Sequence, residues 1–213
     1  MLDIFIFWTG ILLAIGLATS SLEMFALKHL YLSAGLMNWE LSRMRATTLL
    51  KSKWLNYIYK NDHLNQFSFF RLIAALSLFT ACFTSISWWV AFGFFLSFLA
   101  YLLFTLRTPY GLDGSDQAAL LVALIYTILC SSKSENVQLA CHIFLAAQLT
   151  LVYFTSGWNK LKAAPWRSGE YLWKLFSTGF YGMQNLGAFL EKHKTFACFA
   201  SLSIVLFETF FIF

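Results

Sequence analysis

Long apolar stretches separated by short polar segments dominate this sequence. A helix needs roughly 20 apolar residues to cross a hydrocarbon core of about 30 Å. Hydrophobic residues make up 59% of the chain and charged residues only 12%, which is too apolar for an ordinary soluble domain. We therefore predict an all-α, polytopic transmembrane helical bundle with about six membrane helices. The candidate stretches are Ile4–Leu27, Phe67–Ser85, Ile86–Leu106, Gln117–Cys130, Val137–Trp158 and Thr195–Phe213.

The polar segment Lys28–Gln66 is predicted to start with an interfacial helix, because apolar residues recur there at i, i+3 and i+4 spacing. A helix lying on the inner leaflet explains this stripe, and docking of a partner is the alternative. No linker rich in Pro, Gly or Ser divides the chain, so we expect one domain over residues 1–213. The stripe consists of Leu27, Leu30, Tyr31, Ala34, Met37 and Leu41.

The basic residues predict the orientation in the membrane. Met1-Leu2-Asp3 lacks the basic start of a signal peptide, so we expect an uncleaved first helix with its N-terminus outside. In that topology 14 of the 15 Lys and Arg residues lie inside and only Lys133 lies outside, as the positive-inside rule requires. The net charge of +5 then reflects topology and contact with the lipid bilayer, not binding of nucleic acid.

The segment Gln148–Gly169 is the most informative part of the chain for function. An apolar helix runs there directly into Asn159, Lys160 and Lys162. An amine beside hydrocarbon either loses its charge or pairs with an acid. At about 100° per residue, one face of a regular helix carries His142, Tyr153 and Lys160, and a second carries Gln148, Thr155, Asn159 and Lys162.

Acidic residues that need an explanation are found in two places. Asp113 and Asp116 lie in the turn-rich loop 107–116, where they either cap the next helix or meet Lys160 or Lys162. Glu208 lies within the last apolar stretch, so it must be paired, protonated or facing a polar cavity.

Metal and redox sites are not predicted. The four histidines lie in different segments without metal-ligand spacing, and the four cysteines include no C-x-x-C pair. Cys130 and Cys141 flank the same short connection, so a bridge between them is an alternative to two isolated packing residues.

A family resemblance adds to this interpretation. It rests on Gln148, Val152-Tyr153-Phe154, Gly157, Lys160-Leu161, Trp166 and Gly169. This pattern resembles the core of the HTTM membrane family, which includes vitamin K-dependent gamma-carboxylases and bacterial SdpB-like peptide-maturation proteins. The similar region covers approximately residues 67–213.

The resemblance implies a carboxylase-like or peptide-maturation enzyme in which Lys160 is the general base that deprotonates reduced vitamin K or another quinol. A bacterial cytoplasmic membrane and another membrane or secreted polypeptide as partner are the corresponding expectations. The alternative is a noncatalytic membrane scaffold, escort or immunity component for a secreted peptide. The residues expected to line the substrate site are Gln148, Tyr153, Asn159, Lys162, Trp166, Asp113, Asp116 and Glu208.

Overall fold

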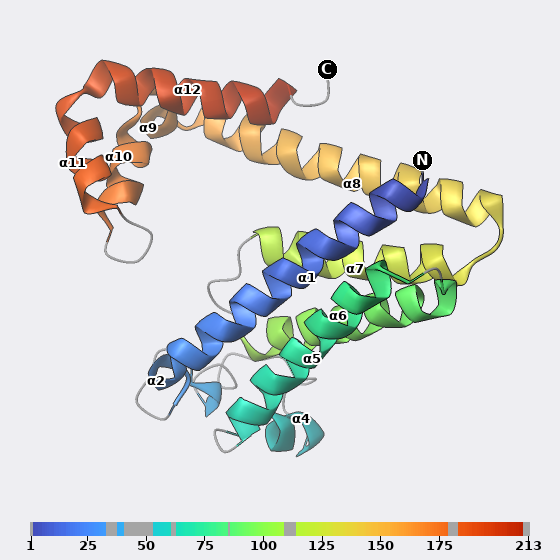
Figure 1. The fold of residues 1–213 in the computed structure, drawn as a ribbon. Coiled ribbons are helices and arrows are strands. Elements are labelled where there is room, and N and C mark those ends of the chain that lie inside the picture. The colour runs from blue at the N-terminus through green and yellow to red at the C-terminus, as the bar shows by residue number, and fades with distance from the viewer. Residues whose placement is uncertain are drawn as a thin grey trace. The chain divides into compact units, whose positions relative to one another are not determined.

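The computed structural model is all-helical over the residues that it describes (Figure 1). Two compact units divide the chain, residues 1–142 and residues 143–213, and helix α8 contributes to both. The described residues are 2–32, 38–40, 53–60, 63–84, 86–108, 114–178 and 183–210. The helices are α1 (Leu2–Ala26), α2 (Lys28–Tyr31), α4 (Lys53–Ile58), α5 (Leu64–Cys82), α6 (Ser87–Arg107), α7 (Gly114–Ser131), α8 (Glu135–Lys162), α9 (Ala164–Arg167), α10 (Glu170–Ser177), α11 (Gln184–Lys192) and α12 (Lys194–Phe210).

In the first unit, α5 packs against both α1 and α6, and α6 packs against α7. Small residues bring these helices close together. A Cβ on Gly93 of α6 would lie only 2.9 Å from the Leu78 Cα of α5, so the two backbones meet without an intervening side chain. Leu17, Ala74 and Ala100 are fully buried in the cluster between α1, α5 and α6.

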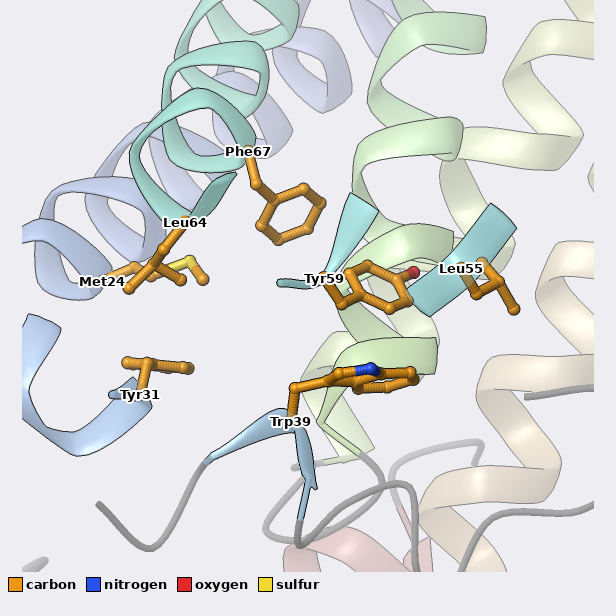
Figure 2. Packing of buried hydrophobic residues seen from close by; sticks show 7 residues of the cluster. All are labelled: Met24, Tyr31, Trp39, Leu55, Tyr59, Leu64 and Phe67. Carbon is orange, nitrogen blue, oxygen red and sulfur yellow. The ribbon is translucent and has the colours of Figure 1, made fainter. Parts of the chain in front are cut away.

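An aromatic cluster closes one end of this unit (Figure 2). The rings of Trp39 and Tyr59 lie 4.6 Å apart, and the Tyr59 hydroxyl donates a hydrogen bond of 2.7 Å to the Leu103 carbonyl of α6. Trp39 and Tyr59, which lie between α1 and α5 in the sequence, are therefore anchored to the bundle. The cluster contains Met24, Tyr31, Trp39, Leu55, Tyr59, Leu64 and Phe67.

The second unit contains the C-terminal part of α8 followed by α9 to α12. Leu172 of α10, Leu190 of α11 and Ala197 of α12 form its buried core. Helices α9 and α10 both contact α12. The residues that follow α8 thus pack against α12, the helix that carries Glu208 of the site described below.

Five helices are long and apolar enough to cross a membrane: α1 over Ile4–Ala26, and α5, α6, α7 and α8 over their full lengths. They confirm five of the predicted stretches as long apolar helices. Helix α7 has 18 residues and begins three positions before the predicted Gln117, so the stretch that looked short is longer than expected. The described part of α12 has 17 residues, and a sixth crossing stays a prediction.

The predicted interfacial helix is much shorter than its apolar stripe suggested. Helix α2 covers only Lys28–Tyr31, because the backbone is extended at Leu32. Tyr31, the last residue of α2, is buried in the aromatic cluster. This end of α2 therefore packs against the cluster. Ala34, Met37 and Leu41 of the stripe lie outside the described residues. One domain over residues 1–213 stays a prediction, because two compact units do not show that either folds independently.

Candidate functional site

Lys160 and Glu208 form an ion pair in the second unit. The Lys160 Nζ lies 2.6 Å from Glu208 Oε1 and 2.8 Å from Oε2, so both carboxylate oxygens accept from one ammonium group. Ser156, one turn before Lys160 on α8, donates a third hydrogen bond of 3.0 Å to Oε2. Of the three alternatives for Glu208, which were pairing, protonation and a polar cavity, the structure shows pairing. In the described part of the chain, the acid that meets Lys160 is Glu208.

Close backbone packing brings α8 and α12 together at this pair. A Cβ on Gly157 would lie 2.6 Å from the Thr209 nitrogen and 2.9 Å from the Glu208 carbonyl carbon. At this distance between α8 and α12, only glycine fits at position 157. The short distance between the helices at Gly157 allows the Lys160 ammonium group to reach the Glu208 carboxylate.

The turn after α8 supplies a second attachment to α12. Gly169 has φ of +77°, a left-handed conformation that glycine adopts without strain, and its α-carbon faces the backbone of Ala197. The Ser201 hydroxyl donates to the Trp166 carbonyl. These contacts position the Trp166 ring, whose centroid lies 5.0 Å from the Lys160 Nζ.

The pair is sheltered but accessible. The Lys160 and Glu208 side chains are 25% and 16% exposed, so an outside group can reach them, whereas bulk water cannot surround them. The Trp166 ring face adds a cation–π contact to the ammonium group. In such surroundings the attraction between opposite charges is stronger than at a fully hydrated surface. The arrangement can hold a proton between an amine and a carboxylate, or bind a polar group of an apolar ligand.

Other predicted residues of α8 do not join this pair. Asn159 and Lys162 are exposed, and the Lys162 Nζ lies 5.0 Å from the Trp158 ring centroid. Tyr153 is exposed and Gln148 is half-buried, and both lie about two turns or more before Lys160 along the helix. Of the predicted residues, the structure brings together Lys160, Glu208 and Trp166.

Of the two acids in the loop 107–116, the structure describes only Asp116. Asp116 lies in the first turn of α7 in the first unit, where it lines a cavity together with Ser20 and Tyr101. Asp113 lies outside the described residues. Ser156 was not predicted, although its place four residues before Lys160 put it on the same helical face.

The cysteines are free thiols, so the alternative of a bridge between Cys130 and Cys141 is wrong. Cys141 is buried and serves as a packing residue. Cys82 and Cys130 line one cavity of about 630 Å³ in the first unit. Over the described ranges, no three His, Cys, Asp or Glu side chains gather as a metal site would require.

Comparison of the chain with models of known families, with curated proteins and with solved structures gives no match.

Proposed function

We propose that this chain is an integral membrane enzyme of the HTTM type in which the Lys160–Glu208 pair exchanges a proton with an apolar, quinol-like substrate. The bidentate contact between the two side chains carries this proposal. An ionisable pair beside long apolar helices is costly to keep and marks a functional site by default. The resemblance of Gln148–Gly169 to the HTTM core supports reduced vitamin K or another quinol as the substrate.

The pair has two ways to accept the proton of a quinol hydroxyl. In the charged form, the Glu208 carboxylate accepts the proton, and the Lys160 ammonium stabilises the oxyanion that remains. In the neutral form, the proton of the ammonium has moved to Glu208, and the Lys160 amine is the base. The second form gives Lys160 the role that the family resemblance implies, and it is the form that we propose to react. In either form the O–H bond breaks, the proton stays on the pair, and no electron is transferred.

Ser156 and Trp166 define the surroundings of this proton. The Ser156 hydroxyl donates to Glu208 Oε2 and favours its charged form. The Trp166 ring lies over the Lys160 ammonium, so it covers one approach to the pair and offers an aromatic face to an aromatic ring. The remaining exposed surface of Lys160 and Glu208 is where the quinol hydroxyl would bind.

A noncatalytic scaffold is the second candidate. The close approach of Gly157 to the Thr209 backbone favours it. An ion pair at such a contact can have a purely structural role, in which it clamps α8 to α12. In that case the chain would anchor or escort another membrane or secreted polypeptide. The two candidates differ in whether Lys160 must be able to lose its proton.

Lys160→Arg is expected to abolish activity while leaving stability nearly unchanged. Arginine keeps the charge and the bidentate contact with a carboxylate, but it does not lose its proton near neutral pH. The full chain in lipid nanodiscs would be supplied with reduced vitamin K under air. Oxygen would take up the two electrons of the deprotonated quinol, and this oxidation would be followed by the fluorescence of the quinol. We expect a loss of at least about 100-fold, which is the usual contribution of a general base.

Lys162→Arg is the matched control, because Lys162 carries the same charge two residues away but contacts the Trp158 ring instead of Glu208. It should keep most of the wild-type rate. Full activity of Lys160→Arg would eliminate Lys160 as a base and leave Glu208 as the base, whereas the absence of quinol turnover in the wild-type protein would favour the scaffold.

The proposed location is a bacterial cytoplasmic membrane with the N-terminus outside, and cysteine labelling tests the orientation. In a variant without its own four cysteines, a cysteine in place of Lys133 should react with an impermeant maleimide in intact cells. Cysteines in place of Lys53 and Lys192 should react only after the membrane is opened, because positive loops stay inside. The reverse pattern of labelling would show the opposite orientation.

A further inference from the structure

Three phenylalanine rings are exposed at the corner where α11 passes into α12 in the second unit (Figure 1). They belong to Phe189, Phe196 and Phe199, whose exposed fractions are 47%, 54% and 71%. The buried core of this unit uses other faces of the same two helices, at Leu190 and Ala197. The core packing therefore turns these rings away from the rest of the unit.

Contacts across the corner gather the exposed rings. The Phe189 and Phe196 centroids lie 5.9 Å apart, with an angle of 73° between the ring planes. The His193 ring lies 4.6 Å from that of Phe189. The rings thus form a continuous apolar surface from the end of α11 to the start of α12. Such surface is costly to keep in water, so it marks contact with a membrane or another molecule.

An open pocket of about 730 Å³ at the same corner brings positive charges beside these rings. Lys192 and Lys194 line it, and both side chains are exposed. In the part of the chain that the structure describes, neither lysine forms an ion pair. Glu191 is the nearest acid along the chain, and it is not among the residues that line the pocket. These are Lys192, His193, Lys194, Thr195, Phe196 and Phe199.

An occupant of this pocket must match both the ammonium groups and the rings. The lysines require negative charge, whereas the rings require an apolar surface beside that charge. A free inorganic anion meets only the first requirement, and an uncharged lipid meets only the second. A phospholipid with net negative charge meets both. In the predicted orientation Lys192 lies inside, and the inner leaflet is the one that carries anionic lipid.

We propose that the corner between α11 and α12 binds an anionic phospholipid of the surrounding bilayer. Lys192 and Lys194 hold its phosphate as two point charges, and its acyl chains lie on the exposed rings. The Thr195 hydroxyl supplies a further hydrogen-bond donor to the headgroup.

This lipid site is separate from the Lys160–Glu208 pair. Phe199 and Glu208 both lie on α12, and the helix rises by roughly 14 Å between them. Lipid binding and quinol turnover are therefore expected to fail independently of each other.

The first test compares phospholipids that differ only in headgroup charge. The full chain in an uncharged detergent would be titrated with phosphatidylglycerol, with phosphatidylcholine of the same acyl chains, or with inorganic phosphate. Native mass spectrometry would measure the affinity of the most tightly bound molecule. Phosphatidylglycerol should bind at least about tenfold more tightly than phosphatidylcholine, because each lysine near an anionic lipid contributes about fivefold. Equal affinities of the two phospholipids would overturn the proposal, and so would equally tight binding of inorganic phosphate.

The second test removes the positive charges. Lys192→Gln and Lys194→Gln should each weaken the tightest binding of phosphatidylglycerol about fivefold, and the double variant about 25-fold. Lys133→Gln is the control, because Lys133 is an equally exposed lysine in the first unit. Since all three side chains are exposed, each variant should unfold at the wild-type midpoint. Unchanged affinity in the double variant, or an equal loss in Lys133→Gln, would overturn the proposal.

Phe199→Ser tests the apolar half of the site. The ring is 71% exposed, so its removal should leave the fold intact. We expect phosphatidylglycerol to bind about fivefold more weakly, because the acyl chain loses apolar contact while both lysines remain. Wild-type affinity in this variant would show that the rings do not contact the lipid, and it would refute a phospholipid as the occupant.

Discussion

Glu208→Gln is expected to destabilise the second unit by roughly 2–3 kcal/mol, between the values typical of exposed and fully buried ion pairs. Glutamine fills the same space but leaves the Lys160 ammonium without its counter-charge on partly buried surface. The effect should appear as a lower free energy of unfolding in mixed micelles. Amide hydrogen exchange in α12 should also become faster, since the pair joins this helix to α8.

Glu170→Gln is the control, because Glu170 forms the same type of pair with Lys174 at a surface site. Those two side chains are 43% and 51% exposed, and such pairs contribute less than about 1 kcal/mol. Equal effects of the two substitutions would show that the Lys160–Glu208 pair is not sheltered in solution.

A double variant separates the clamp from the chemistry. Lys160→Met combined with Glu208→Met removes both charges together, so it leaves no unpaired ion and should recover most of the stability that Glu208→Gln loses. A scaffold would keep its function in this variant. An enzyme that depends on the proton of the pair would be stable and inactive.

The membrane helices could be predicted from the sequence because their signal is local. Runs of apolar residues such as Ile4–Leu27 need no knowledge of their neighbours to be recognised, and α1 follows that run closely. The short stretch before Cys130 was underestimated because α7 begins with polar residues, starting at Gly114, that hydropathy does not count. Polar first turns are common where a helix leaves the membrane.

The ion pair depends on a contact between residues 48 positions apart, which no local pattern specifies. The sequence showed that Lys160 and Glu208 each needed a partner, because an isolated charge beside hydrocarbon is costly. It did not show that they are each other's partner, because the loop 107–116 offered two other acids, Asp113 and Asp116. Gly157 decides the outcome, since it allows α12 to approach α8 at that level.

The burial of two arginines also could not be predicted. Arg71 and Arg107 belong to the predicted inside charges, and both are completely buried in the structure. Near the end of a membrane helix, an arginine that reaches the interface and one that turns inward have the same sequence pattern. Only the rings that pack against these arginines reveal the difference: Tyr31 and Tyr59 at Arg107, and Phe104 at Arg71.

Gly157→Ala is expected to disrupt the second unit more than a single methyl group usually does. The added Cβ would lie 2.5 Å from the Thr209 Oγ1 and 2.6 Å from its backbone nitrogen, and the backbone cannot rotate away as a flexible side chain can. The helices must therefore separate, at a cost of about 1–3 kcal/mol or more. That separation also moves Glu208 away from Lys160, so we expect quinol turnover and thermal stability to fall together.

Gly157→Ala should lower the stability, whereas the same substitution in most helices raises it. Inside an unconstrained helix, replacing glycine by alanine stabilises by up to about 1 kcal/mol, because alanine loses less backbone entropy. Gly114, at the start of α7, has nothing within 4 Å of an added Cβ, so Gly114→Ala should leave the midpoint unchanged or raise it slightly. If Gly157→Ala behaves as Gly114→Ala does, α8 and α12 are not in close contact in the membrane. The Lys160–Glu208 pair would then lack the packing on which both of its proposed roles depend.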